Sequence, residues 1–367
     1  WPIESMIRLF YMQDAKRKLK AHPGLIKVGI VGSYGKTSSK NILFHLLKEN
    51  YLCLKSKHSY NNKMGNTLTI RKELRRMHTL FICEMGSDHV GEIEELMHFI
   101  NPQYVLITSI GNQHLNTFKS QEHIVYEKMS PLLFLKKEDV AILNIDNPYI
   151  YRNQEQGICK KITFGVHEEA QYRLLEIEMN EYGSSFKILY NKQIYTFHTT
   201  LLGRYNIDNL VGCIALAHTL HVDMEILQRM CRRIQPIEHR LESKNMGKYI
   251  LIDNAYNSNP YSFKNSMEVL SKIKKYRILI TPGIIDVKED DYYNEMIMED
   301  VVHVCEEVVL VGKRNRNAMV QGLKTFDYLA YQCVDTMEEA LDYVNKKDMT
   351  DYVVLIENDI DKTLMNL

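Results

Sequence analysis

The chain has 367 residues, 45% of them hydrophobic and 25% charged, which is typical of a soluble globular protein with two or three domains. Its 46 basic and 46 acidic residues balance, so no charge excess favours nucleic acid or an anionic membrane surface as a partner. The 7 cysteines are scattered without a C-x-x-C pair, which argues against a zinc site or disulfide framework and predicts a cytoplasmic location.

Short buried strands alternate with helices in the first half of the chain. The apolar β-rich runs predict strands at Ile26–Val31, Leu80–Met85, Tyr104–Ser109 and Val140–Ile145. Helical patterns follow at about Ser38–Glu49, Gly91–Ile100 and Gln121–Leu135. This order favours an α/β fold, with a mostly parallel sheet covered by helices on both faces.

The pattern changes to two-residue alternation between Tyr172 and Thr200. The runs Phe186–Tyr190 and Gln193–Phe197, separated by Asn191-Lys192, predict a small antiparallel β segment built from hairpins. Helices are predicted to resume from Tyr205 to Ile234.

Pro236 marks the predicted linker between two domains, residues 1–234 and residues 235–367. Beyond it, strands alternate with helices, as expected for a smaller Rossmann-like α/β domain. The predicted strands are Tyr249–Asp253, Arg277–Thr281, Glu307–Val311 and Tyr352–Ile356.

A phosphate-binding loop is predicted after the first strand. It reads Gly32-Ser33-Tyr34-Gly35-Lys36-Thr37-Ser38 and runs into an amphipathic helix. Glycines let backbone N–H groups surround phosphate oxygens, and the helix N-terminus adds its positive dipole end. Lys36 would reach the terminal phosphates of a nucleotide, and Thr37 would offer a hydroxyl to Mg²⁺. The loop therefore predicts a P-loop-type central domain, although Ile30 stands where the general pattern has glycine.

Further short motifs follow in a fixed order. They are Tyr60-Asn-Asn62-Lys-Met-Gly65, Glu84-Met-Gly86, Thr108-Ser-Ile-Gly-Asn-Gln-His114-Leu115, Asn144-Ile-Asp146, Thr163-Phe-Gly165, Gly203-Arg-Tyr-Asn-Ile-Asp-Asn209, His239-Arg240 and Asp253-Asn-Ala-Tyr-Asn-Ser-Asn-Pro260. With the phosphate loop, this series resembles the Mur ligases, a family that includes folate-polyglutamylating relatives. The last motif is most similar to the branch that adds the D-alanyl-D-alanine dipeptide. One such motif is weak support, whereas about eight in order are strong.

The resemblance implies an ATP-dependent, ADP-forming ligase that joins a carboxylate to an amine in cell-wall (peptidoglycan-type) precursor synthesis. Attack of the carboxylate on the γ-phosphate makes an acyl phosphate, which the amine then displaces. Such chemistry needs positioned phosphates, neutralised charge and metal ions. The expected cofactors are ATP and a pair of Mg²⁺ ions, and the expected partners are small-molecule carboxylate and amine substrates rather than nucleic acid.

The resemblance also assigns metal and substrate residues. Thr37 and Glu84 are expected to hold one Mg²⁺, which prefers oxygen ligands. His114, just beyond a strand at the carboxyl edge of the sheet, is expected to bind a second metal ion. Asn62 is expected to contact substrate. Alternatively, His114 is a loop histidine without a role, and Glu84 is a surface carboxylate.

Nucleotide contacts are expected from both domains. By resemblance, Asn209 and Arg240 contact the nucleotide, and Asp253 does so from the second domain. The planar guanidinium of Arg240 suits two phosphate oxygens. Alternatively, Asn209 caps a helix or satisfies its polar groups, and Asp253 ends a strand in a turn. Asn254 departs from the family, which often has a second acid there.

Lys128 resembles the lysine that many Mur ligases carbamylate with CO₂. An ammonium group would repel Mg²⁺, whereas a carbamate supplies anionic oxygens. The reaction requires a neutral amine, and therefore a pKa lowered by burial or nearby cations. A solvated helix lysine is the alternative, and Ser130 stands where relatives often have an acid.

Since the first predicted strand begins at Ile26, we expect the family's usual N-terminal UDP-sugar domain to be missing from this chain. Since the chain starts at Trp1, we expect an upstream segment to be missing, and membrane contact only through it. Alternative functions are a ligase that extends glutamate on folate or makes a poly-amino acid, a P-loop kinase or switch, and a nucleotide-binding pseudoenzyme subunit.

Overall fold

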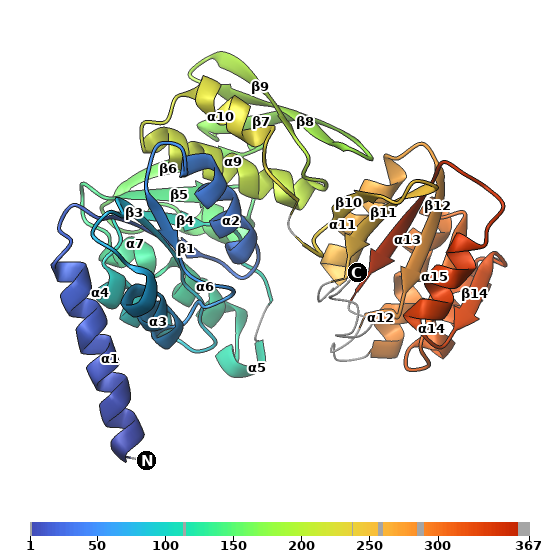
Figure 1. The fold of residues 1–367 in the computed structure, drawn as a ribbon, viewed down its shortest axis with the longest axis horizontal. Coiled ribbons are helices and arrows are strands. Elements are labelled where there is room, and N and C mark those ends of the chain that lie inside the picture. Colours follow the sequence, from blue (N-terminus) through green and yellow to red (C-terminus); the bar gives the residue numbers. More distant parts are fainter. Residues whose placement is uncertain (1, 113–114, 237, 256–259, 285–289, 359–367) are drawn as a thin grey trace. The chain divides into compact units, whose positions relative to one another are not determined.

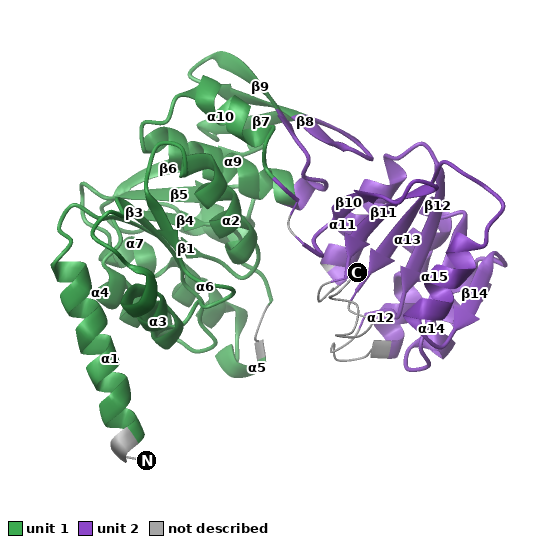
Figure 2. Cartoon of the chain, viewed as in Figure 1, with its two compact units in different colours: residues 1–176, 186–197, 206–234 green, residues 177–185, 198–205, 235–367 purple. Residues whose placement is uncertain are grey.

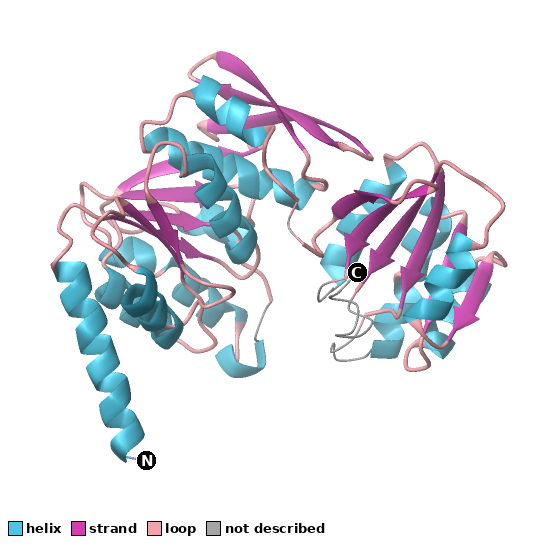
Figure 3. Ribbon diagram, in the orientation of Figure 1, coloured by secondary structure: helices cyan, strands magenta, loops and turns pink. Residues whose placement is uncertain are grey.

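A computed structural model describes residues 2–112, 115–236, 238–255, 260–284 and 290–358 (Figure 1). Two compact units divide the chain (Figure 2). Unit 1 comprises residues 1–176, 186–197 and 206–234, and unit 2 comprises residues 177–185, 198–205 and 235–367. Helices accompany a sheet in each unit (Figure 3), which confirms the predicted α/β fold class.

The main sheet has the strand order β2-β3-β1-β4-β5-β6-β7-β8-β9. Its parallel part comprises β2 (Cys53–Lys55), β3 (Leu80–Glu84), β1 (Ile26–Val31), β4 (Tyr104–Ile107), β5 (Val140–Asn144) and β6 (Lys160–Gly165). The central strands are apolar throughout because both of their faces are covered. Their carboxyl ends lie at one edge, where open α/β sheets place ligands.

The helices of unit 1 include several that the sequence patterns did not predict, among them α1 and α3. In chain order they are α1 (Pro2–Lys20), α2 (Lys36–Leu47), α3 (Lys63–Glu73), α4 (Glu92–Ile100), α5 (Leu115–Phe118), α6 (Gln121–Met129), α7 (Pro131–Phe134), α8 (Pro148–Asn153), α9 (Arg204–Thr219) and α10 (Met224–Cys231).

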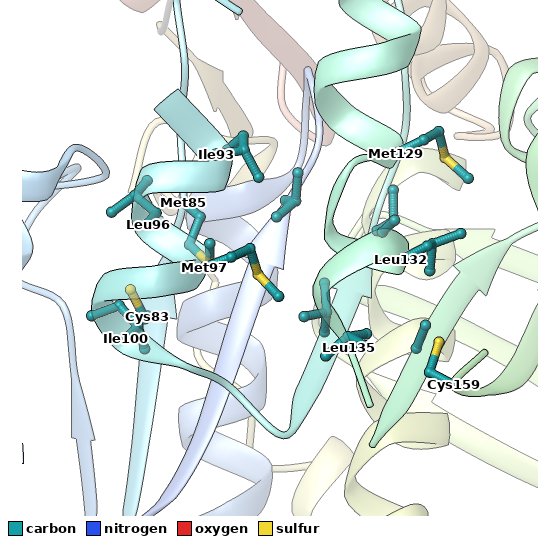
Figure 4. Packing of buried hydrophobic residues seen from close by; sticks show 14 of the residues in the cluster. Cys83, Met85, Ile93, Leu96, Met97, Ile100, Met129, Leu132, Leu135 and Cys159 are labelled. Carbon is teal, nitrogen blue, oxygen red and sulfur yellow. The ribbon is translucent and has the colours of Figure 1, made fainter. Parts of the chain in front are cut away.

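The helix predicted across Gln121–Leu135 is in fact two helices. Pro131 begins α7 because proline lacks the N–H group that would continue the hydrogen bonding of α6. The Ser130 hydroxyl donates to Glu127 O at 2.8 Å at this junction. The break lets both helices pack on α4, where Met97, Met129 and Leu132 form part of a buried core (Figure 4).

The alternating segment extends the same sheet rather than forming one of its own. Its strands are β7 (Tyr172–Asn180), β8 (Gly183–Tyr190) and β9 (Gln193–Thr199), and β7 pairs in parallel with β6. Asn191 and Lys192 both have positive φ, 47° and 64°, as the tight turn between β8 and β9 requires. These strands carry one covered face, which explains their alternating pattern.

The second sheet has the order β10-β11-β15-β12-β13-β14. Its strands are β10 (Glu242–Asn245), β11 (Tyr249–Asn254), β15 (Tyr352–Glu357), β12 (Tyr276–Thr281), β13 (Glu307–Val311) and β14 (Tyr331–Val334), parallel except for β10. Its helices are α11 (Pro260–Ser271), α12 (Asp290–Met296), α13 (Met298–Val304), α14 (Arg316–Thr325) and α15 (Met337–Asn345). Within the described residues, none of the helices in either unit is both long and apolar enough to span a membrane.

Candidate active site

The phosphate loop leaves β1 and enters α2 through two glycines. Gly35 precedes the helix with φ 82°, a left-handed conformation that favours glycine. A side chain at Gly32 would meet the Thr108 hydroxyl at 2.1 Å, so the close approach of loop and β4 also requires glycine. Thr108 Oγ1 in turn donates to Tyr34 O at 2.6 Å and fixes the middle of the loop.

Lys36 folds back over its own loop. Its ammonium group donates to Gly32 O at 2.7 Å and to Ser33 O at 3.0 Å. The charge is therefore held at the loop, where phosphate oxygens bind in this type of motif. The Tyr34 ring packs against Gly111, and burial raises the pKa of its hydroxyl.

Glu84, the last residue of β3, lies beneath the start of α2. The Thr37 hydroxyl is 3.0 Å from Glu84 Oε1 and 3.1 Å from Oε2. Lys40 Nζ lies 2.8 Å from Glu84 Oε2, and both of these side chains are 1% exposed. An isolated buried carboxylate is costly, and the ion pair with Lys40 offsets part of the cost of burying Glu84.

Sequence reasoning missed Lys40. The residue lies one helical turn beyond Lys36, and its ammonium also donates to His58 O. The available signal was a lysine on the face of α2 that also carries the buried Leu43 and Leu47.

The Asn62 motif is linked to the main-chain carbonyl of Glu84 through a neighbouring asparagine. Asn62 caps α3, with its Oδ1 accepting from Gly65 N at 2.8 Å. Asn66 Nδ2 donates to Asn62 O at 3.1 Å and to Glu84 O at 3.0 Å. Asn62 therefore has a structural role as a helix cap, close in the hydrogen-bond network to the end of β3.

Lys128 is buried rather than solvated, with 3% exposure. Its ammonium donates to Ser87 O at 3.0 Å and to Ser87 Oγ at 2.8 Å, just after the strand that ends in Glu84. Burial, then repulsion from the Lys36 charge, lowers the pKa of Lys128 to about 8, against the opposing pull of Glu127. This electrostatic coupling shows that the fold brings Lys36 and Lys128 together.

Asn209 reaches α2 from α9. Ser39 Oγ lies 3.2 Å from Asn209 Oδ1. The Asn209 amide nitrogen and the Ser38 hydroxyl are buried and lack a hydrogen-bond partner among the described residues. Buried polar groups without partners are uncommon and require an explanation, and a bound group is one.

The described residues include only part of the predicted set of metal ligands. Thr37 and Glu84 place a hydroxyl and a carboxylate together, and such oxygen donors suit Mg²⁺ when waters and phosphates complete its shell. The described residues contain no group of three or more His, Cys, Asp or Glu side chains placed to hold a metal ion. His114 lies outside the described residues, as do residues 256–259 of the Asp253 motif.

Asp253 is the penultimate residue of β11 in unit 2. Lys244 Nζ lies 2.9 Å and His239 Nδ1 3.0 Å from Asp253 Oδ2, and the Ala255 N–H donates to Oδ1 at 3.1 Å. Burial works to raise the pKa of Asp253, but these hydrogen bonds, led by that from Lys244, lower it overall. Arg240 is half-buried in the same unit.

Asn254 follows at the position where the resemblance expects a second acid. Its Nδ2 donates to Glu357 Oε2 at 2.7 Å, and its Oδ1 accepts from Leu241 N at 3.1 Å. The amide can serve both groups because it carries a donor and an acceptor, which a carboxylate does not. The departure at this position therefore has a structural reason.

Residues 30–217, just over half of the chain, match the Mur ligase middle domain. The chain belongs to the Mur ligase family. The resemblance seen in the motifs is thereby confirmed, including its similarity to the D-alanyl-D-alanine-adding branch.

A similar Mur ligase is the UDP-N-acetylmuramoyl-tripeptide–D-alanyl-D-alanine ligase of Buchnera aphidicola subsp. Baizongia pistaciae. It is 26% identical over 302 residues, which cover 81% of this chain and 65% of the relative. The chain thus spans about two thirds of the length of that relative.

Solved Mur ligases share the fold. MurF from Acinetobacter baumannii has a TM-score of 0.88 at 22% identity, covering 98% of this chain and 79% of its own. A MurF ligase from Thermotoga maritima in complex with ADP has a TM-score of 0.81 at 20% identity, covering 98% and 82%.

Proposed function

We propose that this Mur ligase is an ATP-dependent, ADP-forming enzyme that joins D-alanyl-D-alanine to the peptide carboxylate of a UDP-N-acetylmuramoyl-tripeptide or a close cell-wall precursor. The names of the similar ligase and structures support this choice of substrates. The observation that carries the proposal is the buried cluster of Thr37, Lys40 and Glu84 beneath the phosphate loop. We also propose a cytoplasmic reaction, which the unpaired state of all 7 cysteines supports.

The phosphate loop binds and orients the transferred group. Gly32–Ser38 supplies backbone N–H groups and the N-terminus of α2, and Lys36 adds a positive charge. Thr37 and Glu84 would hold Mg²⁺, which would neutralise phosphate charge when bound. A carboxylate oxygen of the substrate bonds to the γ-phosphorus as ADP leaves. The amine nitrogen then bonds to the acyl carbon, and phosphate and one proton depart.

Lys128 acts through its carbamate. The neutral amine attacks CO₂, forms an N–C bond and loses one proton, and the product carries anionic oxygens beside Ser87. A pKa of about 8 supports this reaction, because a substantial fraction of the amine is then neutral near physiological pH. Lys128→Ala should impair turnover by about a hundredfold, and added short carboxylic acids should partly restore it. Full activity of that variant, or no effect of removing bicarbonate from the native enzyme, would contradict the modification.

The remaining roles follow the family resemblance. Asn209 and Arg240 contact the nucleotide, Asp253 does so from the domain of residues 235–367, and Asn62 contacts substrate. His114 binds a second metal ion. The buried amide nitrogen of Asn209, which has no hydrogen-bond partner among the described residues, supports the first of these roles.

Phosphate release tests the proposed substrates. We expect release only when ATP, the tripeptide precursor and D-alanyl-D-alanine are all present. Stimulation by a folate and glutamate instead would identify a polyglutamylating ligase. ATP hydrolysis without an acyl acceptor would identify a P-loop hydrolase or switch, and ATP binding without turnover under any combination would identify a pseudoenzyme.

A further inference from the structure

Unit 1 contains a cavity of about 690 Å³ on the side of the sheet formed by β6, β7 and β8. The end of α9 closes it through His218 and Thr219, and Ile162, Ala170 and Leu189 add apolar surface. A volume of this size matches the pockets that hold small organic ligands. None of its lining residues belongs to the phosphate loop or to the Glu84 cluster.

One wall of the cavity is a fixed aromatic group. The rings of Tyr172 and Tyr190 stack with centroids 4.3 Å apart and an interplanar angle of 18°. The His218 ring stands edge-on to both, and its Nδ1 lies 2.7 Å from the Tyr172 hydroxyl. Burial raises the pKa of Tyr172 and lowers the pKa of His218, so both groups are neutral at physiological pH. Tyr172 is almost fully buried, so the half-buried Tyr190 ring, held in place by this stack, provides the surface on which a flat ring can pack.

The charged lining residues are mainly cationic. Lys160, Arg173 and Lys192 line the cavity together with a single carboxylate, Glu168. In the described part of the chain, neither Lys160 nor Lys192 forms an ion pair, and both are exposed. Arg173 Nε donates to Val166 O at 3.2 Å, which restrains its guanidinium group. This cluster favours phosphate or carboxylate groups.

The carboxyl end of α9, which also lines the cavity, does not cancel the preference for phosphate or carboxylate groups. A helix carboxyl end carries partial negative charge on carbonyls that lack partners. Here Ala217 O accepts from Val222 N at 3.2 Å, and His218 O accepts from His221 N at 3.0 Å. His221 adopts φ 62° to close this cap. Hydrogen bonds within the chain therefore satisfy these carbonyls.

We propose that this cavity is a second ligand site, which binds a nucleotide-sized organic anion with a flat ring and a phosphate or carboxylate group. The ring packs on the Tyr172–Tyr190 wall, and Lys160, Arg173 and Lys192 bind the anion. The site is separate from the phosphate loop, because β6 lies three strands from β1 in the sheet, roughly 14 Å at ordinary strand spacing. The proposed ligase would therefore bind this anion in addition to its nucleotide and its two substrates.

The test is calorimetric titration of the full chain with UMP, uridine and inorganic phosphate at low ionic strength. We expect UMP to bind at least about tenfold more tightly than either fragment, because only UMP uses both the ring wall and the cations. Lys160→Glu combined with Lys192→Glu should weaken UMP binding by about tenfold. Tyr190→Ala should also weaken UMP binding while leaving ATP binding unchanged.

The matched control is Lys20→Glu combined with Lys137→Glu, which makes the same charge change at exposed lysines outside the cavity. Its UMP affinity should equal that of the native chain. The proposal is overturned if UMP does not bind at millimolar concentration, if phosphate binds as tightly as UMP, or if the cavity variants and the control behave alike.

Discussion

Glu84 and Asp253 occupy equivalent places in two different sheets, yet their surroundings differ. Each carboxylate lies at or next to the carboxyl end of a strand that has at least one parallel neighbour, is almost fully buried and pairs with a lysine. Asp253 accepts hydrogen bonds from Lys244, His239 and the Ala255 N–H, which occupy both of its oxygens. Among the described residues, Glu84 Oε1, in contrast, accepts a side-chain hydrogen bond from the Thr37 hydroxyl alone.

The difference in surroundings suggests that the two carboxylates have different roles. Glu84 retains a coordination position, beside a hydroxyl and beneath a phosphate loop, that a hard cation can use. Asp253 is held by three hydrogen-bond donors of its own unit, so fewer of its acceptor positions are left for a ligand. We therefore expect the chemistry to depend more on the region around Glu84.

The largest effect is expected from Lys36→Ala. Removing the charge that the loop holds at its backbone carbonyls should lower turnover by about a thousandfold or more, while the fold persists. Lys48→Ala, at the exposed end of the same helix, is the control and should leave turnover unchanged. Near-native turnover in a folded Lys36→Ala protein would remove the phosphate loop from the mechanism.

Lys40→Met tests whether the ion pair with Lys40 offsets the cost of burying the Glu84 carboxylate. Leaving this carboxylate buried and unpaired should lower the free energy of unfolding by about 3–5 kcal/mol, measured by urea denaturation. The double variant Lys40→Met/Glu84→Gln should recover much of that loss, since no charge then remains unpaired. The exposed pair Lys57–Glu73 is the control, and Lys57→Met should cost less than about 1 kcal/mol. Equal costs at the two sites would refute the argument.

Glu84→Gln and Asp253→Asn test the comparison itself. We expect Glu84→Gln to lower kcat by about a hundredfold and to raise the Mg²⁺ concentration required, because the metal loses an anionic ligand. Asp253→Asn should lower kcat by about tenfold or less, with an unchanged Mg²⁺ requirement. A larger effect at Asp253 would reverse the roles that we assign to the two sheets.

The smallest effect concerns the free energy of unfolding, which the burial of the charged Lys128 side chain lowers. Its pKa falls from 10.5 to about 8 on folding, so between these values the unfolded chain binds more protons and stability rises with pH. Below pH 8 the cost is fully present, and Lys128→Met should raise the free energy of unfolding at pH 7 by about 1–3 kcal/mol. In CO₂-free buffer this advantage should shrink as the pH rises toward 10. A destabilised variant, or an advantage that does not change with pH, would contradict the burial of a charged lysine.

Sequence patterns predicted the parallel strands well, because strands covered on both faces are largely apolar runs such as Val140–Leu143. They missed α1 and α3, whose apolar residues do not form a clear helical stripe. Single residues were harder to place. The motif order identified Glu84 and Lys128, but nothing in the sequence showed that Lys40 would be buried against Glu84. Such partners come from segments far apart in the chain and emerge only with the fold.

The central claim, that the substrate carboxylate becomes an acyl phosphate, can be tested by isotope transfer. The tripeptide precursor is labelled with ¹⁸O in its reacting carboxylate and incubated with ATP, Mg²⁺ and D-alanyl-D-alanine. The released phosphate is then analysed by mass spectrometry. We predict that it carries one ¹⁸O atom from the carboxylate, because the carboxylate oxygen that bonds to the γ-phosphorus leaves with the phosphate. Unlabelled phosphate, released together with the amide product, would contradict the mechanism.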